Sequence, residues 1–113
     1  MKALVHTAPL KFEYRDVSEP EFGDDDVPVR VKAVAICGSD VHGYTGTTGR
    51  RIPPIIMGHE AGGIVEAIGR NVQNVAVRDR ITGRIQAKSL ISRIMPLADG
   101  QQAFDALHRG EDL

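Results

Sequence analysis

The chain has 113 residues, the size of one compact domain, and this length leaves no room for a second domain of ordinary size. Hydrophobic residues make up 42% and charged residues 26%, and the formal net charge of -1 provides no bulk field that would bind nucleic acid. No stretch approaches the roughly 18 apolar residues of a membrane span. Cys37 is the only cysteine, so no internal disulfide can form, and we expect a cytoplasmic protein.

The first third of the chain has the pattern of strands separated by turns. Turn-forming residues bound the runs 3–6 and 11–17, which predicts two short strands. A glycine and polar side chains occupy residues 37–42, where we expect a short helical turn. The clearest strand is predicted over 27–36, because small apolar residues alternate there and would share one face: Val27, Val29, Val31, Ala33 and Ala35.

The remaining sequence predicts a loop followed by more short strands. Residues 43–54 have the glycine, threonine and proline content of an exposed loop. Further strands are expected over 64–68, 79–85 and 89–95. Many short strands joined by glycine-rich turns are typical of a small barrel, so the expected fold is mainly β.

One helix is predicted at the C-terminal end. Asp99 and Gln102 have the spacing of a capping box, and Gly110 can end the helix. The apolar stripe expected on this helix is Ala103, Phe104 and Leu107.

Four side chains that can bind metal lie close together in the sequence: Cys37, His42, His59 and Glu60. A thiolate, imidazoles and a carboxylate suit zinc, which prefers tetrahedral nitrogen, sulfur and oxygen ligands. The residue types alone leave another interpretation open. A buried cysteine packs as a small hydrophobe, and an isolated histidine is commonly a hydrogen-bonded structural residue.

Two motifs in this region resemble the paired signature of the zinc-dependent medium-chain alcohol dehydrogenases. The first is Cys-Gly-Ser-Asp-Val-His at 37–42, and the second is Gly-His-Glu-Ala-Gly-Gly at 58–63, followed by Gly69 and Val72. The resemblance covers Met1 to about Arg80 and includes the sorbitol and threonine dehydrogenases of that family. It implies the family's GroES-like catalytic domain, a partly open β-barrel with short helical turns and one C-terminal helix.

The resemblance implies a zinc site built from both motifs. Cys37 and His59 would ligate the metal, and Glu60 would sit at the metal and could enter its coordination shell. Asp40 would fix the second ring nitrogen of the ligating histidine, which raises the basicity of that ligand. Zinc would act as a Lewis acid that stabilises the alkoxide formed before hydride leaves.

The resemblance also implies a path for the alcohol proton. Ser39 and His42, three residues apart on one face of a helical turn, would pass that proton from the metal to solvent. The structural alternatives are a capping role for Ser39 or Asp40 and a plain surface position for His42.

The sequence departs from the family after the second motif. Where the family has Val-Gly-Asp-Arg-Val, residues 77–81 read Val-Arg-Asp-Arg-Ile, with Arg78 in the glycine position. No further cysteine and no Gly-x-Gly-x-x-Gly follow, so the Rossmann domain is missing and no NAD(P) site is predicted. Residues 83–113 instead resemble the family's C-terminal segment. We therefore expect a single GroES-like domain over 1–113, in which an internal deletion joins the family's N-terminal segment (1–80) to its C-terminal segment near 78–83.

These features predict the catalytic-domain portion of a zinc-dependent alcohol or polyol dehydrogenase, inactive alone because hydride transfer needs a bound nicotinamide. Zinc occupancy is open, because the family's downstream third ligand is missing and Glu60 or a second chain would have to replace it. The alternatives are a stand-alone GroES-like zinc-binding unit and a metal-free structural or assembly module.

The loss of a partner domain would uncover apolar surface, which predicts a homo-oligomer. The substrate and the choice between NAD and NADP are not determined by the sequence.

Overall fold

The computed structural model describes residues 1–82 and 94–111, and these residues form two compact units. Unit 1 contains residues 1–18, 36–58 and 94–111, and unit 2 contains residues 19–35 and 59–82. Each unit is built on one three-stranded antiparallel sheet. The join predicted near 78–83 falls partly outside the described residues and stays a prediction.

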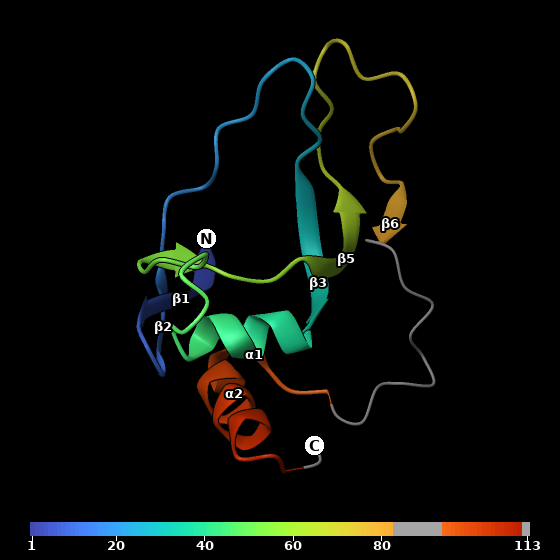
Figure 1. Cartoon of the computed structure of the whole chain (residues 1–113). Helices are drawn as coiled ribbons and strands as arrows, with labels where there is room; N and C mark the ends of the chain where they lie inside the picture. Colours follow the sequence, from blue (N-terminus) through green and yellow to red (C-terminus); the bar gives the residue numbers. More distant parts are fainter. Residues whose placement is uncertain (83–93, 112–113) are drawn as a thin grey trace. The chain divides into compact units, whose positions relative to one another are not determined.

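The sheet of unit 1 has the strand order β2-β1-β4 (Figure 1). β1 spans Lys2–Ala8, β2 spans Lys11–Asp16 and β4 spans Ile55–Ile56. The first two strands form a hairpin in which Lys2 lies opposite Asp16. The strands predicted over 3–6 and 11–17 are therefore confirmed, with ends that differ by one or two residues.

Both predicted helical segments are confirmed in unit 1. The turn after Cys37 is α1, Gly38–Tyr44, and the C-terminal helix is α2, Gly100–His108. α2 is preceded by the 3-10 turn η2, Leu97–Asp99. Gly110 follows α2 with φ +74, the left-handed conformation with which glycine ends helices.

The capping box predicted at Asp99 is wrong. Asp99 has φ -91 and ψ 7, and its side chain makes no capping hydrogen bond. The reason is the 3-10 turn before α2, in which the Asp99 N–H already bonds to the Pro96 carbonyl at 3.0 Å. A side-chain cap needs an extended N-cap residue, and this backbone does not provide one.

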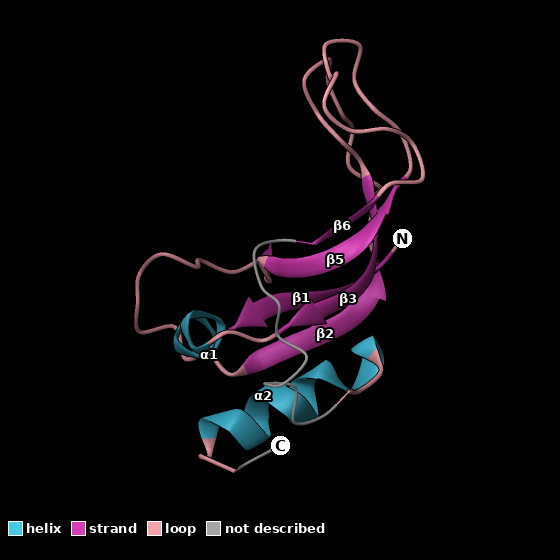
Figure 2. Cartoon of the chain, turned by 90° about the vertical axis from the view of Figure 1, so that its right-hand side faces the viewer, coloured by secondary structure: helices cyan, strands magenta, loops and turns pink. Residues whose placement is uncertain are grey.

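An aromatic cluster forms the core of unit 1. Phe12 of β2, Tyr44 of α1 and Phe104 of α2 are buried together. The rings of Phe12 and Tyr44 stack at 5.3 Å between centroids, and Phe104 lies 4.6 Å from Phe12. Figure 2 shows α2 packed along the sheet at β2. Of the predicted stripe, Ala103 and Phe104 are buried and Leu107 is half-buried, while Ala106 is buried in addition.

A hydrogen-bond network at the edge of this cluster ties the C-terminal helix to the rest of unit 1. The Tyr44 hydroxyl donates to Asp105 Oδ1 at 2.6 Å, and Gln101 Nε2 donates to the Tyr44 hydroxyl at 2.5 Å and to Asp105 at 3.0 Å. Gln101 Oε1 accepts the Phe12 N–H at 2.6 Å. Three polar side chains therefore satisfy one another and one β2 backbone donor, which makes α2 an integral part of this unit.

The sheet of unit 2 has the strand order β3-β5-β6, with β3 Val29–Ala35, β5 Glu60–Val65 and β6 Arg80–Thr82. The strand predicted over 27–36 is confirmed, but a bulge between Val31 and Ala33 changes its faces. Val31 lies opposite Gly63 and Ala33 opposite Gly62, so these two side chains point to opposite faces. The predicted single apolar face is therefore divided at the bulge.

β5 starts earlier than predicted, because its glycines belong to the strand and not to the approach to it. The expected strand over 64–68 is replaced by Glu60–Val65. A Cβ at Gly63 would lie 2.3 Å from the carbonyl oxygen of Arg30, so only glycine allows β3 and β5 to pair this closely. Gly63 therefore serves the close packing of two strands.

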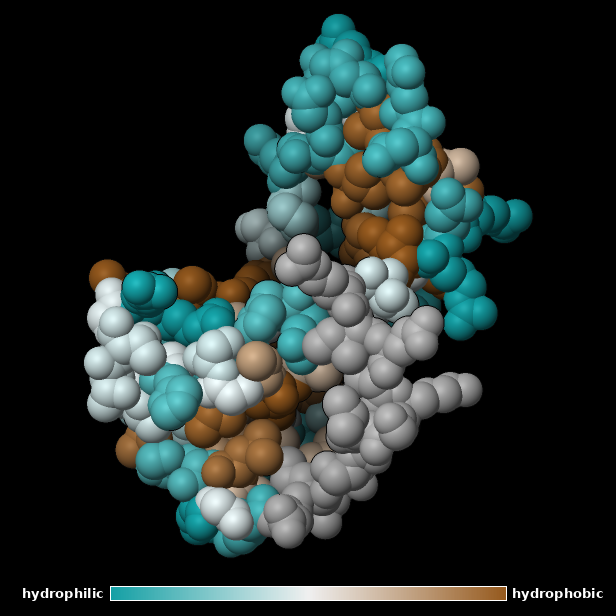
Figure 3. Space-filling view, turned by 45° about the vertical axis from the view of Figure 1, so that its right-hand side comes forward, coloured by the Kyte–Doolittle hydropathy of each residue, from teal (hydrophilic) through white to brown (hydrophobic). Residues whose placement is uncertain are grey.

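The mainly β fold is confirmed for the described residues. Their strands form two separate small sheets and do not close into a barrel. The strand predicted over 79–85 corresponds to β6 up to Thr82, and most of the one predicted over 89–95 lies outside the described residues. Two large apolar side chains of β3 are exposed, Val31 at 55% and Val34 at 43%. Figure 3 shows apolar residues, coloured brown, at the surface of the protein. None of the described helices is long and apolar enough to cross a membrane.

Arg78 adopts a backbone conformation that suits glycine. The Asp79 N–H bonds to the Ala76 carbonyl at 3.1 Å, which closes a four-residue turn with Arg78 in third place. Arg78 has φ +80, the value at the third residue of a type II turn, where glycine is preferred because it has no Cβ. This explains in physical terms why the resembled motif has glycine at the position of Arg78.

We expect acid and alkali to weaken unit 1 through the Tyr44–Asp105 pair. Burial and the hydrogen bond to Asp105 raise the pKa of Tyr44 to about 12, so stability present below about pH 10 is lost as the pH rises toward 12. The hydrogen bond from Tyr44 lowers the pKa of Asp105 below 3.8, so stability present above pH 3.8 is lost as the pH falls through the lowered value. Urea unfolding of the wild type and Tyr44→Phe across this pH range measures both, and the variant should lack the Tyr44 part of the alkaline loss. Tyr14→Phe is the control, because Tyr14 is exposed; equal alkaline losses in both variants would contradict the assignment.

We expect Arg78→Gly to raise the free energy of unfolding by about 1 kcal/mol, because it relieves a left-handed residue that has a Cβ. Arg80→Gly is the matched control: Arg80 begins β6 and pairs with Ile64, and glycine in a strand should cost up to about 0.5 to 1 kcal/mol. Urea denaturation compares the three proteins. A loss of stability in Arg78→Gly would mean that the arginine side chain contributes more than its backbone strain costs.

Candidate metal centre

The pairing of β3 with β5 brings the two sequence motifs together. β3 and β5 lie side by side (Figure 1), and Ala35, the last residue of β3, is paired with Glu60, the first residue of β5. Cys37 follows Ala35 by two residues, and His59 directly precedes Glu60. Covalent geometry then keeps the Cα atoms of Cys37 and His59 within roughly 16 Å of each other. The register alone therefore limits how far apart these two residues can lie, although 22 positions separate them in the sequence.

The donor set at this end of the strands fits zinc. Cys37 offers a sulfur, His59 a ring nitrogen and Glu60 a carboxylate oxygen, the three ligand types that zinc accepts in proteins. Cys37 is a free thiol and half-buried, while His59 is exposed and Glu60 half-buried. Three protein donors with a fourth position left for substrate is the arrangement of catalytic zinc sites.

α1 begins directly after Cys37 and carries the other polar residues of the first motif. Asp40 is 1% exposed, and its Oδ2 accepts the Cys37 backbone N–H at 3.1 Å. Its Oδ1 lies 3.1 Å from Arg51 Nη2 in an ion pair. The capping role considered for Asp40 is therefore present, and it fixes the backbone of the residue that supplies the sulfur.

Ser39 and His42 lie on the exposed part of α1. Both residues are exposed, which agrees with the surface position considered for His42 and also leaves both open to solvent, as a proton path requires. The Ser39 hydroxyl accepts a hydrogen bond from Arg51 Nη2 at 3.3 Å. Ser39 is thus bound to a cation, and no capping bond of its side chain is recorded among the described residues.

Sequence reasoning missed Arg51. Its guanidinium contacts both Asp40 and Ser39 from the loop after α1. Arg51 lies 12 residues after Ser39, in a segment with no helical or strand periodicity that would predict the contact. The composition of this segment, rich in glycine, threonine and arginine, predicted only an exposed loop. A second missed residue is Gln101, whose amide joins Tyr44, Asp105 and β2.

The family model of the alcohol dehydrogenase GroES-like domain matches residues 23–101, more than half of the chain. The chain belongs to this family. A D-xylulose reductase from Morganella morganii is 44% identical over 85 residues, which cover 72% of this chain and 25% of the relative. An L-threonine 3-dehydrogenase from Photorhabdus laumondii is 44% identical over 71 residues, 60% of this chain and 21% of the relative.

A solved structure agrees with these sequence relatives. A proposed zinc-binding dehydrogenase from Sinorhizobium meliloti 1021, bound to NADP, has a TM-score of 0.66 and 35% identity over 79% of this GroES-like domain and 28% of that chain. The predicted membership in the zinc-dependent medium-chain alcohol dehydrogenases is confirmed. The chain is a catalytic-domain portion of this oxidoreductase family, and it spans about a quarter of the length of the curated relatives it matches.

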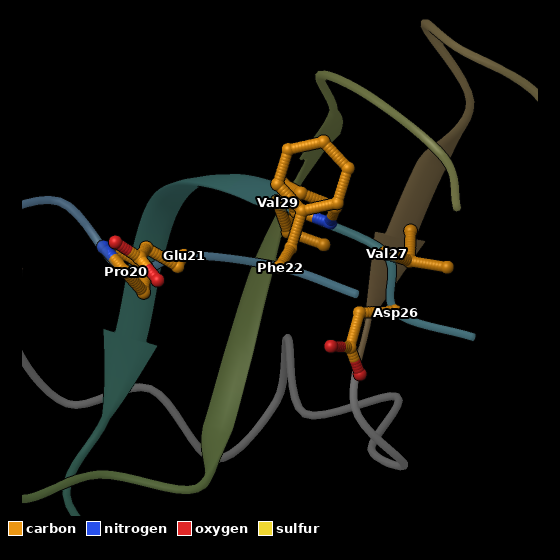
Figure 4. A pocket seen from close by; sticks show the side chains of 7 residues that line it. Pro20, Glu21, Phe22, Asp26, Val27 and Val29 are labelled. Atoms are coloured by element: carbon orange, nitrogen blue, oxygen red, sulfur yellow. The ribbon is translucent and has the colours of Figure 1, made fainter. Parts of the chain in front are cut away.

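A shallow hollow of about 300 Å³ lies elsewhere in the GroES-like domain, in unit 2 (Figure 4). It is lined by residues of the segment that leads into β3 and by the first residue of that strand. None of the predicted metal ligands or proton-path residues lines it, so it provides no support for a substrate pocket at the two motifs. Its lining residues are Pro20, Glu21, Phe22, Asp26, Val27, Pro28 and Val29.

Proposed function

We propose that this GroES-like domain binds a catalytic zinc ion through Cys37, His59 and Glu60 and forms the catalytic part of an alcohol or polyol dehydrogenase. The observation that carries the proposal is the β3–β5 register, in which Ala35 lies opposite Glu60. This register supports the proposal, because it limits the distance between the backbone of Cys37, two residues after β3, and the backbone of His59 and Glu60, where β5 begins. Metal ligands that are far apart in the sequence need such a fixed pairing.

Each side chain has a distinct role in this proposal. Cys37 and His59 bind the metal as thiolate and neutral imidazole, and Glu60 acts as the third protein ligand. Asp40 orients the ligating imidazole while its other oxygen accepts the Cys37 N–H. Bound zinc would supply a Lewis acid that stabilises an alkoxide.

Ser39 and His42 form the proposed exit for the alcohol proton. Ser39 takes the proton through its hydroxyl, and His42, one turn further along α1, delivers it to solvent. The exposure of His42 supports its place at the end of this path, because a proton released at a buried group would have no acceptor.

Hydride transfer requires a nicotinamide held against the substrate carbon. These 113 residues contain no Gly-x-Gly-x-x-Gly motif, so we propose that they transfer no hydride by themselves and need a dinucleotide-binding domain beside them. Relatives named as D-xylulose reductase, D-arabitol-phosphate dehydrogenase and L-threonine 3-dehydrogenase favour a secondary alcohol, commonly a polyol, as the substrate class.

Zinc content tests the metal site. We expect about one zinc per chain in protein purified without added metal, and almost none in a Cys37→Ser/His59→Ala double variant, because both strong ligands are then lost. Glu60→Gln should retain zinc with lower affinity if the carboxylate is the third ligand. Elemental analysis measures the metal, and a chelator competition measures the affinity.

His108→Ala is the control for this experiment. His108 is an exposed histidine of α2, outside both motifs, so its removal should leave the zinc content unchanged. A wild-type chain without zinc would refute the proposal and favour the metal-free structural module. Zinc that survives in the double variant would place the metal elsewhere.

We also propose that the domain self-associates through β3. This strand is an edge of the unit 2 sheet, and it exposes Val31 and Val34. A free strand edge with apolar side chains pairs readily with a second copy. A free thiol in Cys37 agrees with the reducing cytoplasm as the proposed location.

Light scattering at micromolar concentration tests the self-association. We expect a dimer or larger species in the wild type and a smaller one in Val31→Lys, because a charge on the edge strand opposes pairing. Val77→Lys is the control: Val77 is 50% exposed, close to the 55% of Val31, but lies outside the strands. A monomeric wild type would refute this proposal.

A further inference from the structure

Arg51 contacts two motif residues of α1 with a single nitrogen atom. Its Nη2 lies 3.1 Å from Asp40 Oδ1 and 3.3 Å from Ser39 Oγ. The Arg51 side chain is only 25% exposed, and Asp40 is buried, so the ion pair is shielded from water on the carboxylate side. A shielded pair of this kind has a defined geometry, unlike an ion pair between two mobile surface side chains.

The helix provides space for this side chain at Gly43. A Cβ on Gly43 would lie 2.2 Å from Cδ of Arg51. The aliphatic stem of Arg51 therefore crosses α1 at a residue without a side chain, where a Cβ would collide with it. Gly43 is itself buried. The stem therefore packs on the helix, and its guanidinium end reaches back one turn to Ser39 and Asp40.

The chemistry of arginine suits a site that moves protons. The guanidinium keeps its proton in proteins and has no acceptor, so it cannot take the proton that Ser39 carries. A serine hydroxyl has one O–H donor and two acceptor lone pairs. The bond from Arg51 uses one lone pair and leaves the O–H and the second lone pair, which are the two groups that a hydroxyl needs to accept a proton and pass on its own.

We propose that Arg51 is a positioning residue that fixes Asp40 and Ser39 in the first turn of α1, and through them orders both the metal site and the proton path. This inference rests on the proposed function. Asp40 transmits the effect to the metal site, because its second oxygen accepts the N–H of Cys37. Removal of Arg51 should therefore loosen the backbone at the residue that supplies the sulfur ligand.

The neighbouring Arg50 provides a matched control. It is exposed, and no ion pair or hydrogen bond of its guanidinium is recorded among the described residues. Arg50→Met and Arg51→Met thus make the same chemical change in the same loop. Arg51→Lys retains a cation and most of the stem, and it tests whether charge alone is sufficient.

The experiment measures two quantities on the full chain. Competition with a chelating dye gives the zinc affinity, and Co²⁺ substituted for zinc gives an absorption spectrum that reports the coordination geometry. Amide hydrogen exchange at Asp40 and Val41, whose N–H groups bond to the Cys37 carbonyl, reports the order of the first turn.

We expect Arg51→Met to lower the zinc affinity roughly 10- to 100-fold, as losses of partners around metal ligands do. The two amides should exchange roughly tenfold faster, because a hydrogen bond to a charged group is lost. The Co²⁺ spectrum should change as well. Arg51→Lys should recover part of the affinity, and Arg50→Met should match the wild type in every measurement.

Two results would overturn this inference but not the proposed function. In the first, the wild type binds zinc, and Arg51→Met has the same zinc affinity, Co²⁺ spectrum and exchange rates as Arg50→Met. In the second, the amides of Arg51→Met exchange faster, but its zinc affinity and Co²⁺ spectrum do not change. The second result would make Arg51 a brace for the helix only. A wild type that binds no zinc is a different failure, because it refutes the proposed function and this inference with it. If Arg51→Met does not fold, Arg51→Lys decides: a wild-type affinity, spectrum and exchange rate in that variant would overturn the inference that the guanidinium of Arg51 positions Asp40 and Ser39.

Discussion

The antiparallel pairing of β3 with β5 is the constraint on which the rest of the candidate site depends. It places Ala35, two residues before the first motif, opposite Glu60 of the second motif, although these two residues are 25 positions apart in the sequence. The pairing is possible because Gly63 lets the backbone of β5 approach the Arg30 carbonyl. Gly63 thus has a structural task beside the proposed metal ligands, and a side chain there would separate β3, which ends two residues before Cys37, from β5, which begins directly after His59.

A second constraint fixes α1 itself, through residues that lie outside this helix. Tyr44, the last residue of this helix, packs against Phe12 and Phe104 and bonds to Asp105 and Gln101 of α2. Arg51 holds the first turn of the same helix through Asp40 and Ser39. The short helix that follows Cys37 is therefore fixed at both ends by residues outside it. Seven residues could not form a stable helix alone, because isolated helices of this length are unstable in water.

The parts of the fold that could be predicted are those with a local cause. The β1–β2 hairpin, β3 and both helices follow from alternation, turn residues and a helical apolar stripe, and the two motifs were recognisable by residue type and spacing. The errors have non-local causes. The strand was expected to begin only after Gly62 and Gly63, because glycine weakens an isolated strand, but the close approach of the Arg30 carbonyl makes glycine necessary at Gly63. The bulge after Val31 and the contacts of Arg51 depend on partners far away in the sequence, which a local pattern does not contain.

Arg78 illustrates how the pairing of β5 prevails over a local preference. The residue occupies the glycine place of a type II turn with φ +80, a conformation that costs a residue with a Cβ about 1 to 2 kcal/mol. The turn forms nevertheless, because its backbone continues the ladder: the Arg78 N–H bonds to the Val65 carbonyl and the Val65 N–H to the Asp79 carbonyl, both at 2.9 Å. Val65 is only 1% exposed, so its backbone groups would lack partners if these two hydrogen bonds were lost. The two bonds therefore outweigh the strain of the single turn residue Arg78. The departure from the family motif therefore weakens this turn without breaking it, and β5 keeps the register on which the proposed metal site depends.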